Sequence, residues 1–114
     1  MSEVIRQSGV TVVELGSSYD ALDEEALRVF GETLVREAEQ ADPPKLVVDM
    51  SNTTYVASSF LETLVRAWKR IKQRGGAMAL CGVHDLCVEI LEITHLSSLW
   101  PIYSTRDQAI DALK

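Results

Sequence analysis

The sequence contains no long hydrophobic run. None of its apolar stretches approaches the roughly 20 residues that a helix needs to cross a bilayer, which argues against an integral membrane protein. The first ten residues, MSEVIRQSGV, have no basic start followed by an apolar segment, so they predict no secretory signal. We therefore expect a soluble, cytoplasmic protein with no direct membrane insertion.

Cysteine and basic residues are also scarce. Only two cysteines are present, Cys81 and Cys87, which agrees with a reducing compartment because secreted scaffolds usually carry more. The 11 lysines and arginines are outnumbered by 17 aspartates and glutamates, and the net charge is −6. Because contacts to phosphates need a net basic surface, this balance argues against duplex nucleic acid as the main partner.

Signatures of catalysis and of metal binding are missing from the sequence. We find no Gly-rich phosphate loop, no Ser-His-Asp order and no arguable pair of catalytic carboxylates, so no enzyme is expected. Cys81, His84 and Cys87 lie three residues apart but match no tetrahedral zinc pattern, and apolar neighbours favour core cysteines. Asp49 follows a strand, as a receiver-domain phosphoacceptor does, but the other Mg²⁺-site residues are missing, which favours a structural or capping role. We expect no metal and no cofactor.

The hydrophobic pattern predicts alternating strands and helices in a single domain spanning residues 1–114. Strands are predicted at residues 3–7, 10–15, 45–49, 77–81 and 99–103. Helices are predicted at residues 23–40, from about Ser59 to Gly75-Gly76, at 83–94 and at 105–113, the last one capped by Thr105.

This order, ββαβαβαβα, defines the expected fold. Ser8-Gly9 suits a two-residue hairpin, so the first two strands should be antiparallel. Each later strand is followed by a helix, which requires mostly parallel pairing through helical crossovers. We therefore expect an α/β fold with a mixed sheet covered by about four helices. Its core should include Val13, Phe30, Leu34, Val47, Leu61, Leu64, Val65, Leu80 and Ile90.

From Lys45 to Tyr103 the chain resembles the STAS domain, the fold of bacterial anti-sigma factor antagonists. The resemblance is carried by a strand closing on an acid (KLVVD), a short loop reaching a serine pair, a helix ending in Gly-Gly, the strand AMALCG, a further helix and a final strand. The element order of the remaining chain also fits. The resemblance implies a STAS-like sheet and a non-enzymatic, protein-binding module.

The serine pair carries the functional part of the resemblance. In the family the helix start reads Asp-Ser-Ser-Gly or Asp-Ser-Thr-Gly, and the first serine is phosphorylated by a partner that is both anti-sigma factor and serine kinase. Ser58 falls on the phosphorylated position and Ser59 on the second hydroxyl. Ala57 replaces the family's acid and Phe60 its glycine, so the phosphorylation motif is degenerate.

Two interpretations of the serines remain open. Ser58 could be a phosphorylation site, since a phosphate is electrostatically favourable at a helix N-terminus. Alternatively both serines are plain helix caps, and Ser59 followed by Glu62 has the spacing of a capping box. Phe60 lies at the margin of the apolar stripe of its helix, so it either covers the core edge or stands exposed as a contact residue.

Charge is divided between the first two predicted helices, which suggests an electrically two-sided molecule. Such segregation is typical of solvated faces, and it also steers a charged protein partner. The acids of the first helix are Asp23, Glu24, Glu25, Glu32, Glu37 and Glu39, and the bases of the second are Arg66, Lys69, Arg70, Lys72 and Arg74. Family partners dock at the serine loop and the adjoining helix, so the resemblance implies partner contacts at Ala57, Ser58, Phe60, Arg66, Lys69 and Arg70.

Two functions follow from these expectations. The first is an anti-sigma factor antagonist that binds an anti-sigma factor/serine kinase while unphosphorylated and so frees a sigma factor. The alternative is a STAS-like adaptor or structural subunit of a stress-signalling or lipid-transport complex, without a phosphorylation switch. A neighbouring gene for a small serine kinase favours the first, and neighbouring transporter genes favour the second. A monomer or a weak dimer fits either function.

Overall fold

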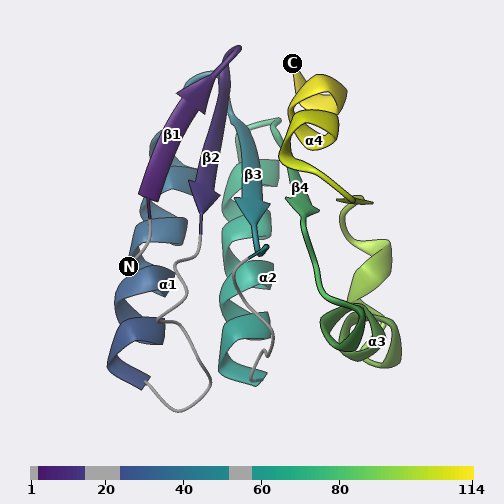
Figure 1. Cartoon of the computed structure of the whole chain (residues 1–114). Coiled ribbons are helices and arrows are strands. Elements are labelled where there is room, and N and C mark those ends of the chain that lie inside the picture. The colour runs from purple at the N-terminus through teal and green to yellow at the C-terminus, as the bar shows by residue number, and fades with distance from the viewer. Residues whose placement is uncertain (1–2, 15–23, 52–57) are drawn as a thin grey trace.

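The structure, a computed structural model, describes residues 3–14, 24–51 and 58–114 (Figure 1). The predicted order ββαβαβαβα is confirmed, with a short 3-10 helix added before the last strand. The elements are β1 Glu3–Gln7, β2 Val10–Glu14, α1 Glu24–Gln40, β3 Lys45–Asp49, α2 Ser58–Gln73, β4 Ala77–Cys81, α3 Asp85–Ile93, η1 Leu96–Ser98, β5 Ile102–Tyr103 and α4 Arg106–Leu113.

The five strands form one mixed sheet in the order β1-β2-β3-β4-β5. As predicted, β1 and β2 are antiparallel and the remaining pairs are parallel. The hairpin turns at Ser8 and Gly9, whose φ angles of 55° and 79° are both positive. Turns of that conformation match the right-handed twist of the flanking strands, which explains the tight connection.

Helices cover the sheet on both faces. Figure 1 shows α1 and α2 side by side on one face, whereas α4 lies on the other. Successive side chains of β3 therefore belong to different hydrophobic cores. Leu46 and Val48 belong to the larger core beneath α1, α2 and α3, and Val47 belongs to the smaller core beneath α4. Burial on both faces accounts for the nearly all-apolar strand sequences.

The predicted core is largely confirmed. Val13, Phe30, Leu34, Val47, Leu61, Leu64 and Leu80 are buried, and both cysteines are inaccessible, as expected. Val65 and Ile90 are only half-buried, at the margin of the larger cluster. Within the described residues, no helix has the length and apolar character needed to cross a membrane.

The end of the sheet differs from the prediction. The last strand has two residues instead of the range 99–103, and Leu96–Ser98 forms a 3-10 turn ahead of it. Pro101 has no N–H to donate to a strand ladder, which explains why the strand begins only after it. Trp100, which lies inside the predicted range, is not in the strand: its side chain is 3% exposed and belongs to the larger core.

Helix boundaries shift by small amounts. α3 begins at Asp85, because His84 is its extended N-cap residue, and it ends before Thr94. Thr105 caps α4 as predicted, through a reciprocal capping box with Gln108. The predicted residues Leu15 and Asp23 lie outside the described part of the chain.

Candidate protein-interaction site

The helix α2 begins at Ser58, the residue that the resemblance places at the phosphorylated position. The first amide groups of a helix lack intrahelical partners, and the helix dipole adds positive potential there, so this position suits an anion. Ala57 and the side chains of Ser58 and Ser59 lie outside the described residues. The predicted cap at Ser59 therefore stays a prediction.

Phe60 is a core residue, which corrects its assignment as a partner contact. Its side chain is 3% exposed and stacks on the ring of Phe30, with centroids 5.4 Å apart. A buried ring offers no surface to a partner in this conformation. The sequence held the signal: Phe60, Leu64 and Ala67 follow helical spacing and all three are buried, so Phe60 continues the apolar stripe.

Arg66, Lys69 and Arg70 are exposed along α2, where the sequence placed a basic face. Among the residues that the structure describes, none of these three forms an ion pair. We call this set the basic stripe. Its guanidinium and ammonium groups are available to acidic groups of another molecule.

The predicted two-sided distribution of charge is wrong, because α1 and α2 are neighbours on the same face of the sheet (Figure 1). The acidic side of α1 is also weaker than its sequence suggests. Glu37 is buried and lies 3.7 Å from Arg6, and Glu32 pairs with Arg28. The basic stripe therefore borders a helix face of mixed charge.

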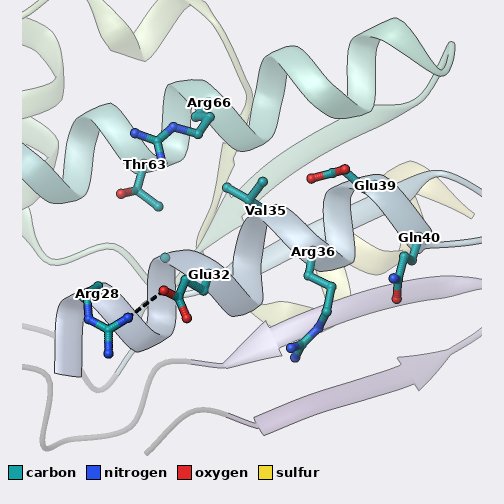
Figure 2. A pocket seen from close by; sticks show the side chains of 9 residues that line it. Arg28, Glu32, Val35, Arg36, Glu39, Gln40, Thr63 and Arg66 are labelled. Carbon is teal, nitrogen blue, oxygen red and sulfur yellow. Dashed lines mark hydrogen bonds and ion pairs between the residues drawn. The ribbon is translucent and has the colours of Figure 1, made fainter. Parts of the chain in front are cut away.

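A groove of about 460 Å³ runs between these two helices. Figure 2 shows Thr63 and Arg66 reaching it from α2, and Val35 and Glu39 from α1. The helices approach closely at Gly31, where an added Cβ would lie 3.2 Å from Thr63 Cγ2. This contact brings charged groups of α1 and α2 to the rim of one groove.

A second groove, of about 390 Å³, lies between α2 and the end of α3. It is lined by Leu61 and Val65 of α2 and by Thr94 and Leu96, with Glu62 at its edge. We call Leu61, Val65 and Leu96 the apolar groove. Ile93, which precedes the groove residue Thr94 in the chain, is 76% exposed, the largest exposure among the large apolar side chains that the structure describes; exposed apolar surface is typical of protein contacts.

Asp49, at the end of β3, has the structural role that was predicted for it. Its Oδ1 accepts hydrogen bonds from Ser51 N at 3.0 Å and Ser51 Oγ at 2.7 Å, and its Oδ2 accepts one from Arg106 Nε at 2.9 Å. Burial alone would raise the pKa of Asp49, but the hydrogen bonds from Ser51 and Arg106 and the guanidinium charge outweigh it, so the pKa lies below its usual value.

The cysteines are unsuited to thiolate chemistry. Burial, reinforced by the charge of Asp49, raises the pKa of Cys81 to about 12, and burial raises that of Cys87. Within the described residues, no group of three His, Cys, Asp or Glu side chains is arranged to hold a metal ion.

Comparison with known proteins agrees with this fold. The model of the STAS domain matches residues 2–109, so the chain belongs to the STAS family. Its relatives include an anti-sigma F factor antagonist of Paenibacillus polymyxa, 25% identical over 112 residues, with 98% of this chain and 93% of that protein covered.

Solved structures extend the comparison. A STAS-domain anti-sigma factor antagonist protein from Planctomyces limnophilus is 36% identical and has a TM-score of 0.90, with 98% of this chain and 97% of that chain covered. The Bacillus cell fate determinant SpoIIAA in its phosphorylated form has a TM-score of 0.73 at 13% identity over 100% of both chains, which shows likeness of fold alone. The chain is thus an anti-sigma factor antagonist-like STAS domain.

Proposed function

We propose that this chain is a non-enzymatic regulator that binds an anti-sigma factor, of the kind that is also a serine kinase, and thereby releases a sigma factor for transcription. The observation that carries the proposal is the layout of α2. The helix begins at Ser58, presents the basic stripe to solvent and borders the apolar groove from its first turns onward. The relatives named as anti-sigma factor antagonists support the same assignment.

The surface suggests the chemistry of the partner. Leu61 lies one helical turn after Ser58 and opens onto the apolar groove, which suits an apolar side chain of a partner. Arg66 and Lys69 stand on the same helix, so acidic residues flanking that apolar anchor would complete the match. Buried apolar contact would supply affinity, and the charges would supply orientation and a faster encounter.

The phosphorylation switch is proposed to be degenerate. Ala57 cannot provide the carboxylate of the family motif, and the ring of Phe60, at the glycine position of that motif, packs on the ring of Phe30. Ser58 keeps an anion-favouring position at the helix start, so a phosphate there would be tolerated by the fold. We therefore propose slow or absent modification of Ser58, and partner binding that is constitutive.

The test uses the anti-sigma factor/serine kinase encoded nearest to this chain in the source genome. Both proteins are purified, their affinity is measured by calorimetry, and the complex is then incubated with Mg-ATP. The expected result is saturable binding with little phosphate on Ser58 by mass spectrometry. Absence of binding at millimolar concentration would overturn the proposal, and rapid stoichiometric labelling of Ser58 would overturn the degenerate switch alone.

A second candidate is favoured by one observation, the conversion of the glycine position of the motif into the core residue Phe60. A STAS-like adaptor or structural subunit of a stress-signalling or lipid-transport complex needs the docking face but no switch. Copurification of the chain with transporter or scaffold subunits, together with no affinity for any anti-sigma factor of the same cell, would select this function.

A further inference from the structure

The helix α4 lies across the sheet from the proposed docking face. Ala109 and Ile110 pack on the smaller core, together with Val12, Val47 and Ala79. Figure 1 shows α4 on the face of the sheet opposite to α1 and α2. Any influence of α4 on a partner bound at α2 must therefore pass through the sheet.

A single side chain provides that route. Arg106, the first residue of α4, donates from Nε to Asp49 Oδ2 at 2.9 Å and places Nη2 2.8 Å from the same oxygen. Its Nη2 also pairs with Glu14. Glu14 and Asp49 are register partners at the ends of the parallel strands β2 and β3. Without a cation between them, these two carboxylates would repel each other.

The contact continues from Asp49 to Ser51. Both the N–H and the hydroxyl of Ser51 donate to Asp49 Oδ1, and His84 Nε2 lies 3.3 Å from the carbonyl oxygen of Ser51. Gly82 packs against the same residue, because a Cβ at that position would lie 2.8 Å from Ser51 Cβ. Residues 49–51 are thus held between α4 and the connection that follows β4.

Ser51 is the last described residue before α2 begins at Ser58. We propose that Arg106 is a positioning residue for the docking face: by bridging Glu14 and Asp49 it fixes the chain at Ser51 and so the placement of the first turn of α2. The two faces of the sheet are thereby coupled, and a change in α4 alters a partner site that α4 does not touch. The coupling itself is a property of the chain, and its meaning for binding rests on the proposed function.

Substitutions can separate this role from plain stabilisation of α4. Arg106→Gln removes the bridge. Arg106→Lys keeps the charge, but an ammonium group lacks the planar fork that reaches two carboxylates at once. Ile110→Val is the matched control, because it loosens the packing of α4 and leaves the ionic bridge in place.

Amide hydrogen exchange of the ¹⁵N-labelled chain, followed residue by residue by NMR, needs no partner. Arg106→Gln is expected to speed exchange by about tenfold at Ser51 and at the first hydrogen-bonded amides of α2, from Glu62 onward, an effect equal to about 1.4 kcal/mol. Arg106→Lys is expected to give an intermediate effect, and Ile110→Val to act on α4 only. If Arg106→Gln changes exchange in α4 alone, or matches Ile110→Val throughout, the inference is wrong.

Binding provides the second readout. The probe is the anti-sigma factor/serine kinase encoded nearest to this chain in the source genome. Arg106→Gln is expected to weaken the complex about tenfold, whereas Ile110→Val leaves it unchanged at equal folded fraction. Equal affinity of Arg106→Gln and the unmodified chain would overturn the coupling. Failure of the unmodified chain to bind would instead count against the proposed function, and the exchange experiment would still decide the inference.

Discussion

The ring of Phe60 stacks on the ring of Phe30, with the two planes inclined by 18° and the centroids 5.4 Å apart. The contact joins the first turn of α2 to the middle of α1, and both side chains are buried. The position that holds glycine in the family motif therefore holds a residue on which two helices of this chain depend.

Replacing Phe60 should consequently damage stability before it affects recognition. Phe60→Ala is expected to lower the free energy of unfolding by roughly 3 to 5 kcal/mol, because it leaves a cavity against Phe30. Gln73→Ala, at an exposed position of the same helix, is the control and should change it by less than about half a kcal/mol. Urea denaturation followed by circular dichroism measures both; a loss below about 1 kcal/mol for Phe60→Ala would contradict the packing.

Charge reversal on the basic stripe should slow association with an acidic partner. Lys69→Glu is expected to reduce the association rate strongly at low salt and weakly at high salt, because salt screens exposed charges. Lys114→Glu makes the same change of charge at the C-cap of α4, across the sheet, and serves as the control. Stopped-flow measurements at several salt concentrations test this, and equal rates for the two variants would show that the stripe is only a solvated surface.

Substitution of Ser59 should affect stability, and substitution of Ser58 should affect partner binding. Ser59→Ala is expected to lower the free energy of unfolding by roughly 0.5 to 2 kcal/mol if Ser59 caps the helix. Ser58→Asp is expected to leave the fold intact, since an anion is favourable at a helix start, and to weaken a partner that recognises an uncharged surface. Thermal denaturation and calorimetric titration separate these effects. Unfolding of Ser58→Asp, or its full affinity for the partner, would contradict the assignment of Ser58.

Acid should destabilise the fold through Asp49. Its pKa in the folded chain lies below the ordinary value of 3.8, so its contribution to stability is complete above that value and is lost as the pH falls through the folded pKa. Asp49→Asn is expected to be less stable at neutral pH and to show a flatter loss of stability below about pH 4. Chemical denaturation at a series of pH values tests this, and parallel curves for both proteins would rule out Asp49 as the titrating group.

Local sequence patterns were sufficient for most of the fold. The predicted ranges 3–7, 45–49 and 77–81 agree with β1, β3 and β4. For β3 and β4 the signal is a short apolar run bounded by turn residues, which is typical of a buried strand, and for the exposed β1 it is the hairpin turn at Ser8-Gly9. The prediction failed at residues 99–101, because the predicted strand was extended through Pro101, which has no N–H to donate to the ladder.

The candidate site could be predicted only in part. The start of α2 and the basic stripe follow from helical periodicity and from the resemblance to the family. The Arg106 bridge could not, because its partners Asp49 and Glu14 stand 57 and 92 residues earlier in the chain. An arginine at the start of a helix and an acid at the end of a strand are each common in sequences, and only the packing of α4 on the sheet brings them together.

The two cysteines belong to different cores, Cys81 of β4 to the smaller one beneath α4 and Cys87 of α3 to the larger one, and neither side chain reaches solvent. A thiol-specific reagent can modify Cys81 only after α4 has moved away, and Cys87 only after α3 itself has moved off the larger core. The modification rates of the two thiols would therefore measure the opening of the two faces of the sheet separately. Both thiols are native, so the measurement needs no substitution. One cysteine would record the detachment of α4, and the other the loosening of α3 beside the apolar groove.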